Sequence, residues 1–272
     1  ELTRVTVDPE TLFDVQVKRM HEYKRQLLNV LHIVHEYLCL IEDQHASAVP
    51  RTYIFAGKAA PGYWAAKQII KLIHNVGRVI NTDSRVQGQL RVVFIPDYRV
   101  SLAEKIIPAA DLSEQISMAG TEASGTGNMK FALNGALTIG TLDGANIEIM
   151  QEVGQENIFI FGLQAHEIQT LRAQGAYEPR EYYTRYPTLK RVLDALNTNC
   201  FCRQEPDLFQ WIYHALLDHG DRYFHLADLP SYIAVQAQVV AEFTHHAQWA
   251  RKAILNVARV GVFSSDRTIR QY

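Results

Sequence analysis

The sequence predicts an α/β fold, a doubly wound parallel sheet of Rossmann-like type followed by helices at the C-terminal end. In residues 1–164, short apolar runs of strand length alternate with segments whose apolar residues recur at helical spacing. Beyond residue 164 the pattern is almost entirely helical. Strands that alternate with helices are typical of a parallel sheet, because each crossover between parallel strands needs a long connection. With 47% hydrophobic and 21% charged residues, the 272-residue chain can bury a substantial core.

The predicted elements follow one another in order. A strand is expected at 12–17, and Leu27, Leu31, Val34 and Leu38 indicate a helix within 21–43. Strands at 52–56 and 90–95 are each followed by a helix, at 63–80 and 102–107. Further strands are predicted at 115–118, 137–139 and 158–161, with a short helix at 130–133. The clearest later helices are 189–196, 208–217, 232–243 and 249–260, whereas the tyrosine-rich segment 177–186 is interpreted as a packed surface loop.

Composition excludes several classes of protein. A net charge of −2 gives no general attraction for nucleic acid or an anionic membrane, and no apolar run reaches the ~18 residues of a membrane span. The three cysteines, Cys39, Cys200 and Cys202, match no zinc or redox spacing, which suits a reducing compartment. We therefore expect a cytoplasmic protein without a metal site. Because residue 1 is not methionine and a strand-like run follows soon after it, the sequence is interpreted as a fragment or processed piece.

Polar or cationic side chains follow four consecutive predicted strands. They are Lys18 and Arg19, then Lys58, then Asp97, Tyr98 and Arg99, and finally Thr121 and Glu122 with a glycine-rich segment that leads to Lys130. In an open parallel sheet, ligands bind beyond the carboxyl ends of the strands. We therefore expect these side chains to lie around one ligand site.

A basic cluster stands where the first predicted strand gives way to a helix: Lys18, Arg19, Lys24 and Arg25. Cations at a helix N-terminus oppose its dipole, at a cost of roughly 0.3–1 kcal/mol each. An anionic ligand would reverse that cost. The cluster therefore favours an anion site over the alternative, a solvated charged surface.

The segment from Glu122 to Lys130, E-A-S-G-T-G-N-M-K, has two glycines and two hydroxyl residues before a predicted helix. Such a turn can direct backbone N–H groups at a phosphate, although the spacing is neither a Walker loop nor a dinucleotide fingerprint. Lys130 comes one helical turn after Thr126, so both can face one ligand. A lysine among apolar neighbours can form an imine. The alternatives are a tight turn and a surface lysine.

Four ordered motifs resemble glycogen and maltodextrin phosphorylases. They are V-K-R-M-H-E-Y-K-R-Q-L-L-N from Val17, F-A-G-K-A-A-P-G-Y from Phe55, Y-R-V-S-L-A-E-K from Tyr98, and E-A-S-G-T-G-N-M-K from Glu122. The last continues in N-G-A-L-T-I-G-T-L-D-G-A-N, and the likeness extends to S-S-D-R-T-I near the end. The family has two Rossmann-like domains that face a cleft, the arrangement called GT-B. The resemblance implies that residues 1–272 are most of the C-terminal domain, which binds pyridoxal 5′-phosphate (PLP) and phosphate, without the N-terminal domain.

The resemblance also implies a role for each matching residue. Lys130 corresponds to the lysine that holds PLP as an imine, and Lys130, Arg19 and Lys24 are implied to be catalytic. Cofactor contacts are implied for Lys18, Tyr98, Arg99, Gly125, Thr126 and Gly127. Arg19 and Lys24 are implied to bind the phosphate substrate, and Glu122, Ala123, Ser124 and Gly125 the glucosyl unit.

The implied reaction is retaining phosphorolysis. Orthophosphate removes the terminal α-1,4-linked glucose of a glucan and yields glucose 1-phosphate, while the cofactor's phosphate relays a proton. Basic residues would offset the repulsion between the two phosphates. The resemblance further implies a homodimeric full-length enzyme and an inactive isolated fragment. The alternatives are a PLP- or glucan-binding domain without turnover and another GT-B transferase.

Overall fold

The computed structural model describes residue 3, residues 5–42 and residues 49–272. Within these residues, six parallel strands form one sheet in the order β3-β2-β1-β4-β5-β6. The strands are β1 Leu12–Val17, β2 Arg51–Ala56, β3 Leu90–Ile95, β4 Leu112–Gln115, β5 Leu137–Gly140 and β6 Phe159–Ile160. This strand order is that of a doubly wound Rossmann-like sheet, so the predicted fold class is confirmed.

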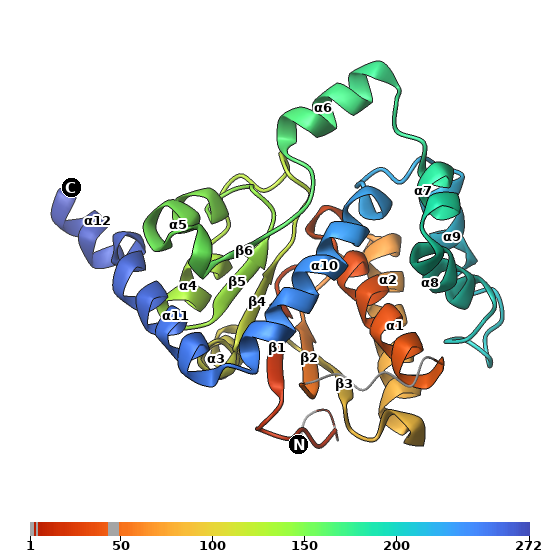
Figure 1. The fold of residues 1–272 in the computed structure, drawn as a ribbon, viewed down its shortest axis with the longest axis horizontal. Helices are drawn as coiled ribbons and strands as arrows, with labels where there is room; N and C mark the ends of the chain where they lie inside the picture. The colour runs from red at the N-terminus through yellow and green to blue at the C-terminus, as the bar shows by residue number, and fades with distance from the viewer. Residues whose placement is uncertain (1–2, 4, 43–48) are drawn as a thin grey trace.

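Helices cover both faces of the sheet (Figure 1). One face carries α1 Gln26–Glu42, α2 Trp64–Thr82 and α10 His225–Phe243, with α7 Pro179–Arg185, α8 Pro187–Asn197 and α9 Gln210–Leu217 packed beside them. The other face carries α3 Val100–Ile106, α4 Gly127–Leu133, α5 Asn146–Val153 and α11 His246–Arg259. Helix α6 Ala165–Gln174 projects from the body, and α12 Ser265–Gln271 ends the chain (Figure 1). The 3-10 turns are η1 Glu22–Lys24, η2 Ser84–Val86, η3 Ile107–Ala109, η4 Gln155–Asn157 and η5 Val260–Phe263.

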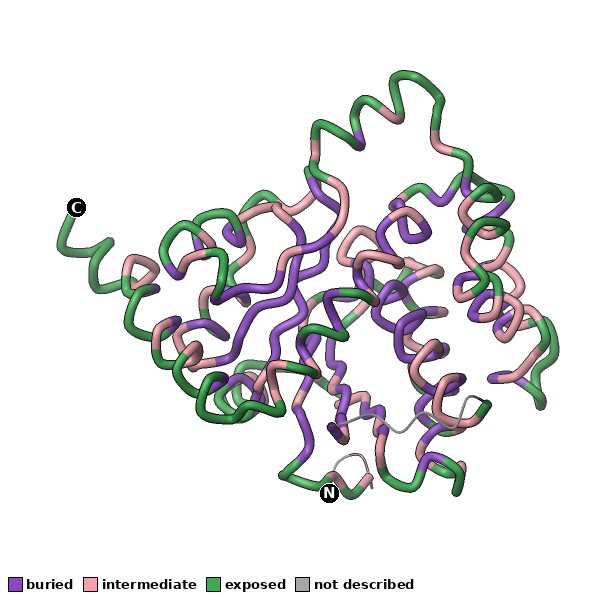
Figure 2. Tube along the Cα trace, in the orientation of Figure 1, coloured by how far each residue is buried: buried purple, intermediate pink, exposed green. Residues whose placement is uncertain are grey.

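The sheet is buried on both faces, as Figure 2 shows for most of its strand residues. Leu12 of β1 packs with the core beneath α1, whereas Val15 and Val17 pack against residues of α3 and α4 on the opposite face. Such two-sided burial explains why the strands are recognisable as apolar runs. The chain winds from β1 toward β3 on one side and from β4 toward β6 on the other. The gap between the carboxyl ends of β1 and β4 is therefore the topological switch point, where ligands bind in such sheets.

The fourth strand was wrongly placed by the sequence pattern. It was predicted at 115–118 but spans Leu112–Gln115. The pattern missed its start because Ser113 and Glu114 are polar, although both are fully buried. The apolar run that follows, from Ile116 to Met118, has already left the sheet, and the Met118 N–H donates to the Tyr23 carbonyl at 3.0 Å.

The predicted positions of helices also need correction at three places. The segment 177–186 is not a loop, because α7 begins with Pro179 at its first position and Glu178 caps it by accepting from the Arg180 N–H. The helix predicted at 21–43 is split by Arg25, whose left-handed backbone (φ 57°) separates η1 from α1. Its predicted last residue, Asp43, lies outside the described residues. Helix α5 was not predicted at all.

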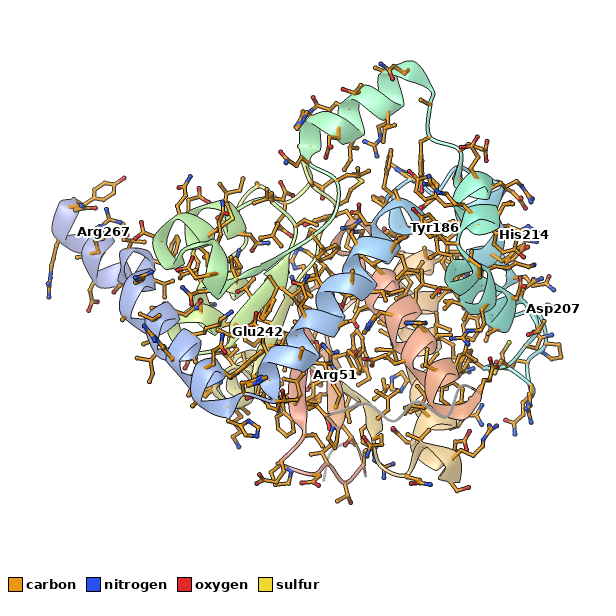
Figure 3. All side chains as sticks on the ribbon, viewed as in Figure 1. Arg51, Tyr186, Asp207, His214, Glu242 and Arg267 are labelled. Carbon is orange, nitrogen blue, oxygen red and sulfur yellow. The ribbon has the colours of Figure 1, made fainter. Side chains whose placement is uncertain are left out.

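A buried polar group, here called the core cluster, lies between the sheet and α10 and consists of Asp14, Arg51, Glu114 and Gln236. Arg51 pairs with Asp14 at 2.5 Å and donates to Gln236, and Gln236 Nε2 donates to Glu114 Oε1 at 2.8 Å (Figure 3 labels Arg51). Burial raises the pKa of Asp14 to about 6 and raises that of Glu114 well above its usual value. The core cluster therefore tends to hold a proton on a carboxyl group near neutral pH.

Within the described part of the chain, no helix combines the length and the apolar character that crossing a bilayer requires.

Candidate active site

The site forms where β1 and β4 end side by side. Beyond β1, the Lys18 N–H continues the strand pairing by donating to the Ala56 carbonyl at 3.0 Å. The Lys18 side chain turns to β4 and donates to Gln115 Oε1 at 2.7 Å. Gly57 permits the close approach of the two chain segments that follow β1 and β2, because a Cβ there would lie only 2.1 Å from the Lys18 carbonyl oxygen. The first predicted cation is thus held across the switch point.

A pocket of about 760 Å³ opens at this point. Its volume lies within the usual range for small-molecule and cofactor sites. Predicted site residues that line it are Lys18, Arg19, Lys24, Tyr98, Glu122, Ser124, Gly125, Thr126, Gly127 and Lys130. These predicted residues come from three separate segments of the sequence, whereas Lys58, which follows the second predicted strand, does not line the pocket and pairs with Asp97 instead.

Charged groups on one wall form what is here called the pocket cluster: Lys18, Arg19, Lys24 and Glu122. Lys24 Nζ lies 2.6 Å from Glu122 Oε2, which also accepts from Ser117 Oγ at 3.0 Å. Burial alone would raise the pKa of Glu122, but the bond from Lys24 and its charge lower it. For Lys24, burial is the largest single influence and opposes the charged form, but the bonds and charges of Glu122 and Tyr23 together outweigh it and raise the pKa. The two residues therefore stabilise each other in their charged forms.

The other two cations of the pocket cluster are less well balanced. Burial, together with the charge of Lys24, lowers the pKa of Lys18 to about 8. The Arg19 side chain is exposed and makes no hydrogen bond or ion pair with any of the described residues. The pocket cluster thus has three cations and one carboxylate. With Lys130 and Glu104, which also line the pocket, the lining has four cations and two carboxylates, so the pocket is positively charged and suited to an anion.

The glycine-rich segment forms the next wall and leads into α4. Gly125 has a φ of 80°, which L-residues with side chains rarely adopt, and it turns the chain toward Thr126. The Lys130 N–H donates to the Thr126 carbonyl at 3.2 Å, which places the two residues one turn apart. Lys130 is exposed, and its amine has no side-chain partner among the residues that the structure describes.

Apolar side chains line part of the pocket and form what is here called its apolar wall. It includes Tyr98, Val100, Ala103 and Ile107 from the β3–β4 connection and Phe131 from α4. Tyr98 is half-buried, and burial raises its pKa. A flat aromatic group with an anionic substituent would find both an apolar face and cations here.

Several predicted residues lie elsewhere. Arg99 is exposed and bonds Asp97 and Ser101, and neither Arg99 nor Ala123 lines the pocket. Arg25, grouped with the basic cluster by the sequence, instead points into the core and pairs with Asp228 at 2.6 Å.

Two residues near the site were missed. Gln115, the partner of Lys18, is a polar residue at the end of a buried strand and lines the pocket. Asp143 follows β5 and accepts from the backbone N–H of Glu122 at 2.7 Å. Asp143 would have been found if the search for polar residues at strand ends had included the fifth strand.

Comparison with known proteins gives a consistent result. The carbohydrate phosphorylase family model matches residues 1–272. The chain is 54% identical over 270 residues to a glycogen phosphorylase of Synechocystis sp. and 54% identical over 269 residues to the muscle form of Bos taurus. It is 53% identical over 269 residues to the muscle form of Homo sapiens. Each match covers 99% of this chain but 32% of the relative, so the chain spans about a third of the length of these curated relatives.

Proposed function

Because the chain belongs to the carbohydrate phosphorylase family, we propose that it is the PLP- and phosphate-binding domain of an α-glucan phosphorylase. The whole enzyme would transfer the terminal glucosyl unit of an α-1,4-glucan to orthophosphate and release glucose 1-phosphate. One observation carries the proposal: one pocket at the switch point gathers a lysine amine without a partner among the described residues, an excess of cations and an apolar wall. Residues 1–272 would form one wall of a cleft whose other wall is a second domain.

The residues of the pocket fit PLP, which combines an aromatic ring, an aldehyde and a phosphate. The Lys130 amine is available to bond the aldehyde, and Tyr98 with its apolar neighbours offers a surface for the ring. Lys18, Thr126 and Gly127 would hold the cofactor's phosphate, as cations and N–H groups do at such turns. When bound, PLP supplies a phosphate group that can exchange a proton with the substrates.

The remaining polar residues would hold the substrates. Arg19 and Lys24 would bind orthophosphate. Glu122, Ser124 and Gly125 would form hydrogen bonds with the glucosyl hydroxyls. Since Lys24 bonds Glu122 at 2.6 Å, the phosphate and sugar positions are linked through one ion pair. Preorganised cations at the place where phosphates meet stabilise the charge that develops in the transition state. Contacts from Arg99 and Ala123, a homodimeric enzyme and a cytoplasmic location stay predictions.

The proposal is tested with the full-length enzyme reconstituted with PLP. It should release glucose 1-phosphate from maltoheptaose and orthophosphate, and the enzyme without PLP should release none. An enzyme that neither releases glucose 1-phosphate nor binds PLP would refute the proposal. PLP binding without turnover would favour a binding domain, and transfer from a sugar nucleotide would favour another GT-B transferase.

The isolated 272-residue chain provides a second test. Without the opposite wall, water would enter the site and weaken its electrostatics, and the substrates would be poorly positioned. We expect the isolated chain to bind PLP but to give no measurable glucose 1-phosphate in the same assay. Steady turnover by this chain alone would show that the second wall is not required.

A further inference from the structure

Asp143 does not line the pocket, but its carboxylate holds the backbone of the segment that does. Asp143 lies in the turn after β5, and its Oδ2 accepts two backbone N–H groups, from Thr121 at 3.1 Å and from Glu122 at 2.7 Å. Hydrogen bonds to an ionised carboxylate are about twice as strong as those between neutral groups. The Glu122 backbone is therefore fixed by a residue that does not itself line the pocket.

The same turn supports the glycine-rich segment at a second point. The Ala145 N–H donates to the Ser124 carbonyl at 2.8 Å. Gly144, with a φ of 50°, comes so close that a Cβ would lie 2.6 Å from the same carbonyl oxygen. A side chain at position 144 would therefore push the two segments apart.

The segment from Thr141 to Asn146, which follows β5, is itself anchored to the end of β4. Thr141 Oγ1 donates to the Ser117 carbonyl at 2.7 Å, and Asn146 Nδ2 donates to the Gln115 carbonyl at 3.0 Å. Ser117 and Gln115 are themselves partners of Glu122 and Lys18. The support under Glu122 is thus tied to the strand that carries the other half of the site.

We propose that Asp143 is a positioning residue that keeps the Glu122 carboxylate on Lys24 and Ser117 during the reaction. The inference rests on the proposed function of the pocket. Thr121 is also held locally, because its N–H donates to the Met118 carbonyl at 3.1 Å. The acceptor of the Glu122 N–H is Asp143, and glycines stand two residues before Glu122 and three residues after it. Asp143 restrains this backbone through contacts from 21 and 22 residues away. A misplacement of about 1 Å near reacting groups can reduce a rate by on the order of 10².

The test compares variants of Asp143 with matched variants of Asp111 in the full-length PLP enzyme. Asp111 accepts the Phe13 N–H at 2.9 Å and precedes β4, at the opposite edge of the sheet from the pocket. Asp143→Ala should lower kcat by about 10–100-fold and Asp143→Asn, with a weaker acceptor, by about 3–10-fold. Asp111→Ala and Asp111→Asn should lower thermal stability comparably but change kcat by less than about twofold. Cofactor content, measured by absorbance, should stay near one per chain in all four variants.

A double-mutant cycle identifies the route of the effect. If Asp143 acts through Glu122, adding Asp143→Ala to Glu122→Gln should lower kcat by less than about twofold further. The proposal would be overturned if the kcat of the double variant fell by the product of the losses in the two single variants. It would also be overturned by kcat values for Asp143→Ala and Asp143→Asn that match wild type per folded enzyme. If Asp143→Ala does not fold, Asp143→Asn alone decides by the same criteria. A wild-type enzyme without phosphorolysis would instead refute the proposed function, which separates the two failures.

Discussion

The core cluster and the pocket cluster lie on the same sheet but differ in how their charges are balanced. In the core cluster, Arg51 faces the two carboxyl groups of Asp14 and Glu114, and burial raises both carboxyl pKa values. In the pocket cluster, three cations face only Glu122, and the cavity lies beside them. One cluster has an excess of acid and the other an excess of base.

The difference shows that burial or exposure to solvent determines whether a proton or a ligand compensates an excess of charge. In the dry interior, a proton bound to a carboxyl group restores the balance, because burial of an uncompensated charge is costly. At the wall of an open pocket, an anionic ligand can restore it. We therefore expect changes in the core cluster to affect stability, and changes in the pocket cluster to affect catalysis.

The largest effect is expected from Arg51→Met. It leaves Asp14 and Glu114 buried without their cation, and breaking a buried pair in this way typically costs about 3–5 kcal/mol of unfolding free energy. Denaturant unfolding should show this loss, while kcat per folded enzyme stays within about twofold of wild type. Adding Asp14→Leu should recover part of the stability. A tenfold loss of kcat at normal stability would remove the distinction between the clusters.

Arg19→Ala should give the converse result. Losing one preorganised charge contact in a transition state typically costs about 10²–10³ in rate. Because the Arg19 side chain is exposed, unfolding free energy should change by less than about 0.5 kcal/mol. Steady-state phosphorolysis is compared with Arg78→Ala, which removes another exposed arginine, on α2. Near-normal turnover by Arg19→Ala would mean that the pocket cluster is a solvated charged surface.

Glu114→Gln tests the core cluster through the pH dependence of thermal stability. The folded pKa of Glu114 lies above its unfolded value, so its contribution to stability is present at low pH and is lost as pH rises through the folded pKa. Asp14, with a pKa of about 6, loses its own contribution over roughly pH 4–6. Glutamine cannot ionise, so the variant should lose less thermal stability than wild type between pH 5 and 8. Glu152→Gln, on the surface of α5, should follow wild type, and parallel curves for all three proteins would contradict the assignment.

The smallest effect concerns Lys18. With a pKa lowered to about 8, Lys18 loses its charge between pH 7 and 9. Affinity for pyridoxine 5′-phosphate, which has no aldehyde to bond Lys130, should fall by about tenfold over that range if only charged Lys18 binds the phosphate. Titration calorimetry measures this fall, and Lys18→Arg should abolish it. An equal fall in Lys18→Arg would assign the pH dependence to another group.

The two clusters also explain which parts of the structure could be predicted from the sequence. Strand β3 was placed correctly because both of its faces are largely apolar. Strand β1 has Asp14 and Gln16 on one face, but its other face, with Phe13, Val15 and Val17, is wholly apolar and gave the signal. Strand β4 was displaced because Glu114 is buried by Gln236, which lies 122 residues away and gives no local signal. Arg25 was grouped with the pocket cations for the same reason, since its partner Asp228 is 203 residues away. By contrast, Pro179 and Glu178 are a local helix start that could have revealed α7.

The candidate site was more predictable than β4, because polar residues at strand ends need no distant partner to be recognised. The structure places Lys18, Arg19, Lys24 and Lys130 around one pocket. What the pattern could not give is the support beneath them. The bond from Lys18 to Gln115 and the bonds from Thr121 and Glu122 to Asp143 depend on how β4 and β5 align.

The proposal that Lys130 holds PLP in this pocket has a direct chemical test. The full-length enzyme is loaded with PLP, reduced with borohydride to fix the cofactor to the protein, digested and analysed by mass spectrometry. We expect a single cofactor adduct, on Lys130, and loss of that adduct in Lys130→Ala. An adduct on another lysine, or none in a folded protein that was exposed to PLP, would contradict it.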